Sequence, residues 1–283
     1  MITAISYKCK CFGHGASLLL LVLALTAAAS AQRIAVFSPD SGKQSIAYAE
    51  RLQNALDAKF QVLDSGMALS AYASLKIEDP YNLAIETAKN IGTLIGCVHF
   101  VMVKARTDRR SSSARPSYFE ASAFIYLVDA RTGRLEHWLL ASARDDASPV
   151  AEKKLNDSSE TAADAIYAKI KDAAGKHRDE PRFEMFDPDN KSMRPAMPYK
   201  RIKPEYTNTA FLFDVKAVID AEVSIDETGS VRRIDIVRWA GFDLEESVIA
   251  AVRKMNWRPG ERNGKPLAMR VLLRYNFTKI DKE

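Results

Sequence analysis

Residues 1–31 constrain this chain more than any other feature, because they decide where the remainder folds. Two lysines and no acidic residue accompany Ala16–Ala29, an unbroken run of small and apolar residues. The run has 14 residues, fewer than the ~20 that a membrane-spanning helix needs. Small residues then end at Ala31, ahead of Gln32, as at a signal-peptidase site. We therefore predict an export signal over 1–31, cleaved between Ala31 and Gln32; an uncleaved anchor is the alternative.

The cysteines limit how the exported chain is stabilised. Cys9 and Cys11 precede the apolar run, whereas the lipidated cysteine of a lipoprotein follows it. After cleavage only Cys97 remains, and one thiol forms no internal disulfide. Cys97 lies in an apolar run, so we expect a buried structural thiol. The mature protein must therefore be stable through its core alone.

Composition places the chain among globular proteins of one or two domains. It has 283 residues, 47% of them hydrophobic and 27% charged, which excludes a disordered chain, a collagen-like fibre and a polytopic membrane protein. Without the two lysines of residues 1–31, 39 basic residues stand against 36 acidic ones. That balance is too weak to indicate nucleic-acid binding.

Residues 32–177 alternate between short β-rich runs and amphipathic stretches in the order β-α-β-α-α-β-β-β-α, which predicts an α/β layer domain. Thr107–Pro116 is polar and rich in arginine, so we expect a loop. In the next strand, Tyr118, Phe124 and Tyr126 share a face, and we expect them to pack as core against a helix over Glu152–Lys176; a ligand platform is the alternative. The other expected elements are strands at Arg33–Phe37, Phe60–Leu63, Val98–Ala105, Tyr118–Asp129 and Leu135–Ser142, and helices over Ser45–Lys59, over Met67–Leu75 and from Asn82.

Residues 178–198 lack periodicity and contain several prolines, which predicts a linker. Residues 199–283 then read as a second, smaller ββαβ domain. Val215–Ile225 and Val231–Arg238 form a predicted hairpin, Asp243 is the expected cap of the helix, and Ala268–Phe277 is the last strand. The expected fold class is therefore α+β, with an α/β layer domain followed by a small ββαβ domain.

Several short motifs follow one another in the second domain: Asp226-Glu-Thr-Gly229, then Leu244-Glu-Glu-Ser-Val248, then Met255-Asn-Trp257-Arg-Pro259, then Asn263-Gly264-Lys265-Pro266. Gly229 supplies the positive φ of a tight turn, and Trp257 supplies a large apolar surface beneath the sheet. Together they resemble the TonB C-terminal domain over residues 199–278. Pro204, Tyr206 and Ala210 stand where that family has its opening motif, with Thr207 in place of the usual second proline.

The N-terminal domain carries a second resemblance. Ile95-Gly96 precedes a strand, and Leu127–Leu135 forms a hairpin with the sequence Asp129-Ala-Arg-Thr-Gly133 at its turn. These features are similar to periplasmic domains of the TolB N-terminal, CsgG and penicillin-binding-protein-activator type. The similarity is one of fold and does not fix a function.

The motifs of common enzymes are absent from the sequence. It has no phosphate-binding Gly-x-x-x-x-Gly-Lys loop, no His-Glu-x-x-His and no Gly-x-Ser-x-Gly. The four histidines are scattered; His99 and His137 lie on different predicted strands and could meet, but structural roles are favoured over a metal site. We therefore expect no catalytic residue, no cofactor, no metal and no small-molecule substrate.

Two groups of residues are candidates for binding. The resemblance to TonB implies that the last strand is an edge that accepts an extended segment of a receptor through main-chain hydrogen bonds. Four arginines around Thr107–Pro116 form a candidate site for an anionic partner, with a solvated loop as the alternative. The strand residues are Met269, Arg270, Val271, Leu272, Leu273, Arg274, Tyr275, Asn276 and Phe277, and the arginines are Arg106, Arg109, Arg110 and Arg115.

These observations favour a periplasmic, non-catalytic binding protein. The resemblance implies an outer-membrane receptor or another envelope protein as partner, and a link to TonB-dependent transport; a second copy of the chain is a further candidate. One alternative is an envelope scaffold or assembly factor acting through its N-terminal domain. The other is an energy transducer anchored in the inner membrane and facing the periplasm. The family's transducers keep an N-terminal anchor and a long proline-rich spacer, whereas this chain has a cleavable-looking signal and a short linker.

Overall fold

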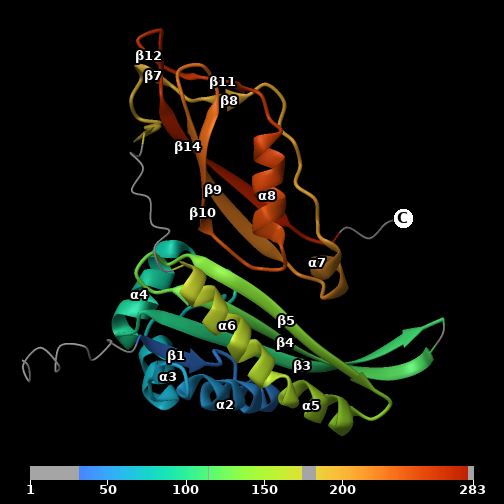
Figure 1. Cartoon of the computed structure of the whole chain (residues 1–283). Helices are drawn as coiled ribbons and strands as arrows, with labels where there is room; N and C mark the ends of the chain where they lie inside the picture. The colour runs from blue at the N-terminus through green and yellow to red at the C-terminus, as the bar shows by residue number, and fades with distance from the viewer. Residues whose placement is uncertain (1–31, 114, 174–182, 280–283) are drawn as a thin grey trace, which may run out of the picture. The chain divides into compact units, whose positions relative to one another are not determined.

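The computed structural model describes residues 32–113, 115–173 and 183–279. Its N-terminal part, residues 33–173, is built on a five-stranded sheet of order β2-β1-β3-β4-β5 (Figure 1). The central strand β3 pairs in parallel with β1 and antiparallel with β4. The strands are β1 (Arg33–Phe37), β2 (Gln61–Val62), β3 (His99–Ser112), β4 (Arg115–Asp129) and β5 (Leu135–Asp145).

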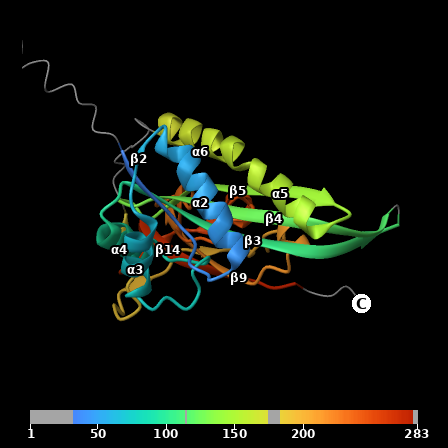
Figure 2. The same cartoon turned by 90° about the horizontal axis from the view of Figure 1, so that it is seen from below.

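Helices lie on both faces of this sheet. On one face α2 (Lys43–Asp57), α5 (Ser148–Asp157) and α6 (Ser159–Ala173) bury a cluster of aliphatic side chains, and Figure 2 shows these helices in front of the strands. On the other face α3 (Ser65–Ala73) and α4 (Ile85–Ile95) contribute to a second cluster. The predicted order of elements is therefore present.

One predicted helix is interrupted. The helix expected over Glu152–Lys176 is two helices, because α5 ends where the Ser158 hydroxyl donates to the carbonyl of Leu155 at 2.6 Å. A serine that bonds to nearby backbone competes with helix continuation. The residues beyond Ala173 in the expected helix lie outside the described part of the chain.

The loop expected over Thr107–Pro116 is wrong. β3 runs to Ser112 and β4 starts at Arg115, and they pair as a two-stranded ribbon past the end of β5. Polarity suggested a loop, but an antiparallel pair is held by its backbone hydrogen bonds and can carry polar side chains on both faces. Cross-strand ion pairs, such as Arg110 with Glu120 at 3.3 Å, favour the pairing.

The C-terminal part, residues 183–279, has a four-stranded sheet of order β10-β9-β14-β6. α8 (Leu244–Arg253) packs against this sheet, as the ββαβ prediction requires. The sheet strands are β9 (Ala217–Ile225), β10 (Val231–Arg238), β14 (Met269–Phe277) and β6 (Glu184–Met185). The smaller elements are α7 (Asn208–Leu212), β7 (Met193–Arg194), β8 (Met197–Pro198), β11 (Trp257–Arg258), β12 (Gly260–Arg262) and β13 (Lys265–Leu267).

The segment expected to be a linker, 178–198, falls partly outside the described residues. Its described portion carries β6, β7 and β8. Each pairs with a later strand: β6 with β14, β7 with β12, and β8 with β11. The segment before the second sheet therefore contributes three short strands to it and to its neighbours.

In the C-terminal part, the structure agrees with the predicted turn at Gly229 and the predicted burial of Trp257, but not with the predicted helix cap. Gly229 has φ +84°, and a Cβ there would lie 2.3 Å from the carbonyl oxygen of Trp257, so no other residue fits without strain. Trp257 is buried as predicted. The cap of α8 differs from the prediction, because Asp243 makes no side-chain cap bond. Glu245 instead accepts the amides of Ala240 and Gly241 at 2.6 and 2.9 Å.

The face of β4 that carries Phe124 and Tyr126 does not meet α6, so that prediction is wrong. The Phe124 ring lies 4.8 Å from that of Phe213, and Tyr126 lies 6.2 Å from Trp239. α6 packs on the opposite face. Successive residues of a strand point to opposite faces, so the strand was predicted correctly but the neighbour of each face was not.

Candidate functional site

The strand expected to bind a partner is β14. Its side chains alternate between a buried and an exposed face, as they should in a sheet with one face in the core. Its inward-facing side chains enter the core under α8, whereas Leu272 on the other face is 51% exposed. The inward-facing set is Met269, Val271, Leu273, Tyr275 and Phe277, and the outward-facing set is Arg270, Leu272, Arg274 and Asn276.

The backbone of β14 has one paired edge and one largely open edge. β9 pairs with it along its whole length, from Met269↔Ile225 to Phe277↔Ala217. On the other side, the carbonyl of Arg270 accepts the amide of Phe186 at 2.9 Å. The backbone amides and carbonyls of successive residues point alternately to the two edges of an antiparallel strand. Those of Leu272, Arg274 and Asn276 therefore point to the same edge as those of Arg270. The carbonyl of Arg274 is bound by the Arg201 guanidinium at 2.6 Å.

β6 covers only the beginning of this edge. It pairs in parallel with Met269 and Arg270, and the Arg270 guanidinium bonds to the Phe183 carbonyl at 2.7 Å. Among the described residues, no strand pairs with β14 on this side beyond Arg270. The backbone from Leu272 to Asn276 is therefore placed to accept an added strand, which would replace the bond from Arg201 to the Arg274 carbonyl.

Ion pairs hold the exposed face of β14. Arg274 binds the carboxylate of Asp220 on β9 at 2.7 and 2.9 Å, and Arg238 contacts the same carboxylate at 3.2 Å. Burial opposes ionisation of Asp220, but its bonds to both guanidinium groups outweigh burial and lower its pKa. Arg270 is paired with Glu222 at 2.5 Å. These pairs fix the register of β14 against β9.

A groove of about 590 Å³ lies beside the open edge. Its walls come from the C-terminal end of β14 and from Lys203–Phe211, the segment that carries the opening TonB motif. Tyr206 anchors this segment, because its hydroxyl donates to the carbonyls of Ala210 and Val215 and its ring stacks on Phe277. Phe211 is 47% exposed at the rim. The groove offers apolar contacts to a strand added at β14.

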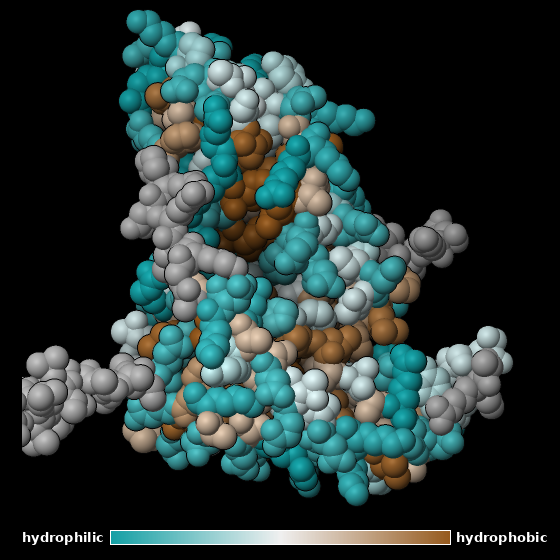
Figure 3. All heavy atoms as spheres, viewed as in Figure 1, coloured by the Kyte–Doolittle hydropathy of each residue, from teal (hydrophilic) through white to brown (hydrophobic). Residues whose placement is uncertain are grey.

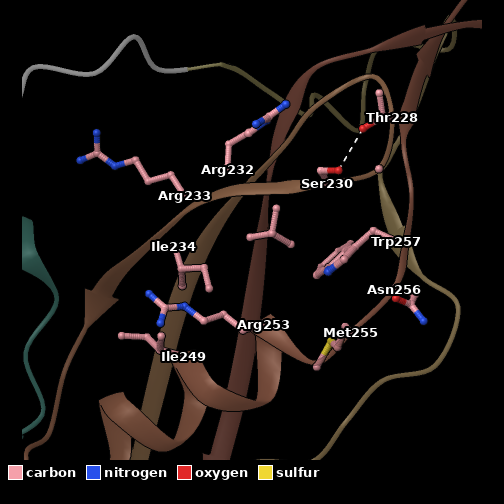
Figure 4. Close-up of a pocket in the computed structure, with 12 residues that line it drawn as sticks. Thr228, Ser230, Arg232, Arg233, Ile234, Ile249, Arg253, Met255, Asn256 and Trp257 are labelled. Atoms are coloured by element: carbon pink, nitrogen blue, oxygen red, sulfur yellow. Dashed lines mark hydrogen bonds between the residues drawn. The ribbon is translucent and has the colours of Figure 1, made fainter.

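A second hollow of about 620 Å³ lies between β10 and the end of α8. Figure 3 shows hydrophobic groups at the base of a hollow between these elements and hydrophilic groups around it. Figure 4 shows Arg232, Arg233 and Arg253 around this pocket, with Trp257 on its far wall. Arg232 is paired with Asp226 and Arg233 with Asp235, both at 2.6 Å. Two of the three guanidinium groups are therefore neutralised by carboxylates.

The arginines of the predicted anionic site belong to the paired strands β3 and β4 rather than to a loop. Arg106 and Arg110 both contact Asp108, at 3.0 and 3.4 Å, and Arg109 bonds to the Ser117 hydroxyl. Arg115 begins β4, and its side chain is outside the description. Binding of an anion by these residues stays a prediction, and acidic neighbours compete for their charge.

The cleavage site and the lone thiol complete the sequence-derived residues. Ala31 lies outside the described residues, which begin at Gln32. Cys97 is partly buried, and burial raises the pKa of its thiol to about 12, so the thiol is protonated at neutral pH. No helix within the described ranges is long and apolar enough to cross a membrane.

Comparison with known proteins agrees with the C-terminal motifs. The family model of the Gram-negative bacterial TonB protein C-terminal matches residues 203–278. The C-terminal part of the chain is therefore a TonB C-terminal domain, and the predicted family is confirmed over this segment. The model reaches the end of β14 and includes the groove-lining segment. No curated protein matches the chain.

Solved structures share parts of the chain at low similarity. Lipoprotein GNA1162 from Neisseria meningitidis has 14% identity and a TM-score of 0.32, over 50% of this chain and 99% of that one. The LpoB C-terminal domain from Salmonella enterica has 16% identity and a TM-score of 0.26, over 45% and 94%. The hypothetical protein CT253 from Chlamydia trachomatis has 12% identity and a TM-score of 0.30, over 51% and 95%. Similarities this low support no functional comparison, and the resemblance of the N-terminal part stays a prediction.

Proposed function

We propose that this protein is a periplasmic, non-catalytic binding protein that captures an extended segment of an outer-membrane receptor, or of another envelope protein, on the open edge of β14. The observation that carries the proposal is the backbone of Leu272–Asn276, which has β9 on one side and no strand on the other among the described residues. An exposed edge of this kind accepts a peptide through main-chain hydrogen bonds. The TonB C-terminal match at 203–278 supports a link to TonB-dependent transport.

The chemistry of the edge defines the partner segment. It must be extended and free of proline where its amides meet Leu272 and Asn276. Side chains on one face of the added strand would meet the groove formed with Tyr206 and Phe211, so apolar or aromatic residues fit there. The partner strand either starts beyond Arg270 or displaces β6.

Photo-crosslinking tests this proposal. A photoreactive amino acid placed at Asn276 in cells should crosslink to an envelope protein through one short segment. Leu272→Pro removes a backbone amide that points to the open edge and should abolish the crosslink. Leu272→Ala removes the side chain but keeps this amide, so the crosslink should remain. A crosslink that persists in a folded Leu272→Pro variant would contradict strand addition at this edge.

Mass spectrometry of the mature chain tests the proposed location. A soluble periplasmic product that starts at Gln32 agrees with the proposal. A full-length, membrane-bound product would contradict it and support the anchored transducer.

A further inference from the structure

Three residues with metal-binding side chains meet at one end of the five-stranded sheet. His99 opens β3 and Asp129 closes β4, and they are direct partners in the β3–β4 register. Glu136 belongs to β5, where the pairing with β4 shifts between Leu127↔His137 and Val128↔Leu135. Glu136 is thus the extra residue of a bulge, and bulges redirect side chains. One ligand atom from each of His99, Asp129 and Glu136 lies within 4.8 Å of the other two.

Two atoms of this cluster are buried without a hydrogen bond. His99 is 6% exposed, and its Nδ1 finds no hydrogen-bond partner in the described ranges; the same holds for Oε2 of Glu136. The contact between Nε2 of His99 and Oε2 of Glu136 is 3.3 Å, but it does not satisfy that oxygen as a hydrogen bond. Buried polar atoms are almost always paired, so the unpaired Oε2 of Glu136, which faces Nε2 of His99, points to an additional bound group.

We propose that His99, Asp129 and Glu136 bind a divalent transition metal ion, with Zn²⁺ as the best-fitting ion. Tetrahedral Zn²⁺ with bonds of about 2.0–2.1 Å separates neighbouring ligand atoms by about 3.3–3.4 Å. Nε2 of His99 and Oε2 of Glu136, 3.3 Å apart, already have this spacing, so these two atoms are the proposed ligand atoms and Nδ1 of His99 is not one. One imidazole nitrogen and two carboxylate groups form a zinc ligand set with a fourth position for water or a partner side chain.

The surrounding structure orients the cluster and places it beside a cavity. Asp129 is held by its Oδ1, which accepts the Thr132 amide at 2.7 Å in the following turn, as second-shell contacts of ligands commonly do. Glu136 also lies on the wall of a cavity of about 440 Å³. His137, its neighbour on β5, lines the same cavity but is not part of the cluster. It therefore provides a matched control.

Calorimetric titration of Zn²⁺ into the metal-free purified protein tests the site. We expect one ion per chain, with binding about 100-fold weaker or absent in Glu136→Gln and in His99→Gln, and unchanged in His137→Gln. Zn²⁺ should also raise the melting temperature of the wild type and of His137→Gln but not of Glu136→Gln, because a ligand that binds only the folded state stabilises it.

Cobalt provides an independent readout. Co²⁺ bound at a tetrahedral site gives visible absorption bands, which should appear in the wild type and be lost in Glu136→Gln. Absence of Zn²⁺ binding, or full-strength binding to folded Glu136→Gln, overturns the proposal. Circular dichroism shows whether each variant folds. If His99→Gln does not fold, Glu136→Gln alone tests the proposal. This variant should fold, because it changes one atom of a side chain that is 15% exposed.

Discussion

Glu245 should make the stability of the protein depend on pH near neutrality. Its carboxylate is buried at the start of α8 and accepts two backbone amides. Burial, the largest influence, outweighs these bonds and raises its pKa to about 7, from an ordinary value of 4.5. Between these two values the folded protein keeps a proton that the unfolded chain has lost. The contribution of Glu245 to stability is therefore greatest below pH 4.5 and falls as the pH rises to about 7.

The size of this loss follows from the two pKa values. A pKa difference of one corresponds to about 1.4 kcal/mol, so the shift of Glu245 from 4.5 to about 7 corresponds to about 3 kcal/mol. This is a large fraction of the 5–15 kcal/mol that is typical of a folded domain. Glu245→Gln keeps an oxygen that can accept the same amides but does not titrate. The variant should lose the pH dependence.

Urea denaturation followed by tryptophan fluorescence at pH 5, 6, 7 and 8 measures this effect. The free energy of unfolding of Glu245→Gln relative to wild type should rise by about 2–3 kcal/mol between pH 5 and pH 8. Glu246→Gln changes the exposed next residue and removes only the smallest of the influences on the Glu245 pKa, so it should retain most of the decline of the wild type. A difference between Glu245→Gln and wild type that stays constant across this range would refute the reasoning.

Two further predictions concern a turn and the edge of the C-terminal sheet. Gly133 has φ +69° and a Cβ there would lie 2.0 Å from the Ile85 carbonyl oxygen, whereas Gly264 has φ +77° with nothing within 4 Å. Gly264→Ala should lower the stability by the ~1–2 kcal/mol of left-handed backbone strain, and Gly133→Ala should lower it by well over that amount because it adds a steric clash. Thermal unfolding measures both, and equal losses of stability would contradict the steric argument. Phe186→Pro removes the amide that bonds to the Arg270 carbonyl and so weakens the competition of β6 for the edge. Loss of one hydrogen bond of about 1 kcal/mol should increase crosslinking of a partner at Asn276 about 5-fold. Phe186→Ala keeps that amide, so a similar increase in both variants would show that β6 does not compete through its backbone.

Local sequence predicted most of the elements because their signals are local. Strand alternation puts Val271 and Tyr275 on one face of β14, the face that the structure buries, and Gly229 marks a turn of positive φ. Polarity misled the prediction at Thr107–Pro116, since a ribbon held by backbone pairing and ion pairs needs no apolar alternation. The break between α5 and α6 was missed because Ser158 leaves the hydrophobic stripe intact.

The cluster proposed to bind a metal could not be predicted from residue spacing. His99, Asp129 and Glu136 are separated along the chain, and their approach depends on the β3–β4 register and on a bulge in β5. The sequence held one signal of this cluster. His99 begins one predicted strand and Asp129 ends the next, so an antiparallel pairing of the two strands places these residues opposite each other. A period-two pattern fixes the face of a residue but not the register of its partner strand.

By itself, the sequence determined the order of the main helices and strands, the two faces of β14 and the TonB C-terminal domain, because propensity, periodicity and turn residues act over a few neighbours. Only the tertiary structure decided that Phe124 faces Phe213 rather than α6, that β6 pairs with β14 and that three ligand-type side chains meet at one end of the first sheet. These contacts join segments far apart in the chain. Burial selects an apolar or polar side chain at each position, but it does not specify which distant segment covers it.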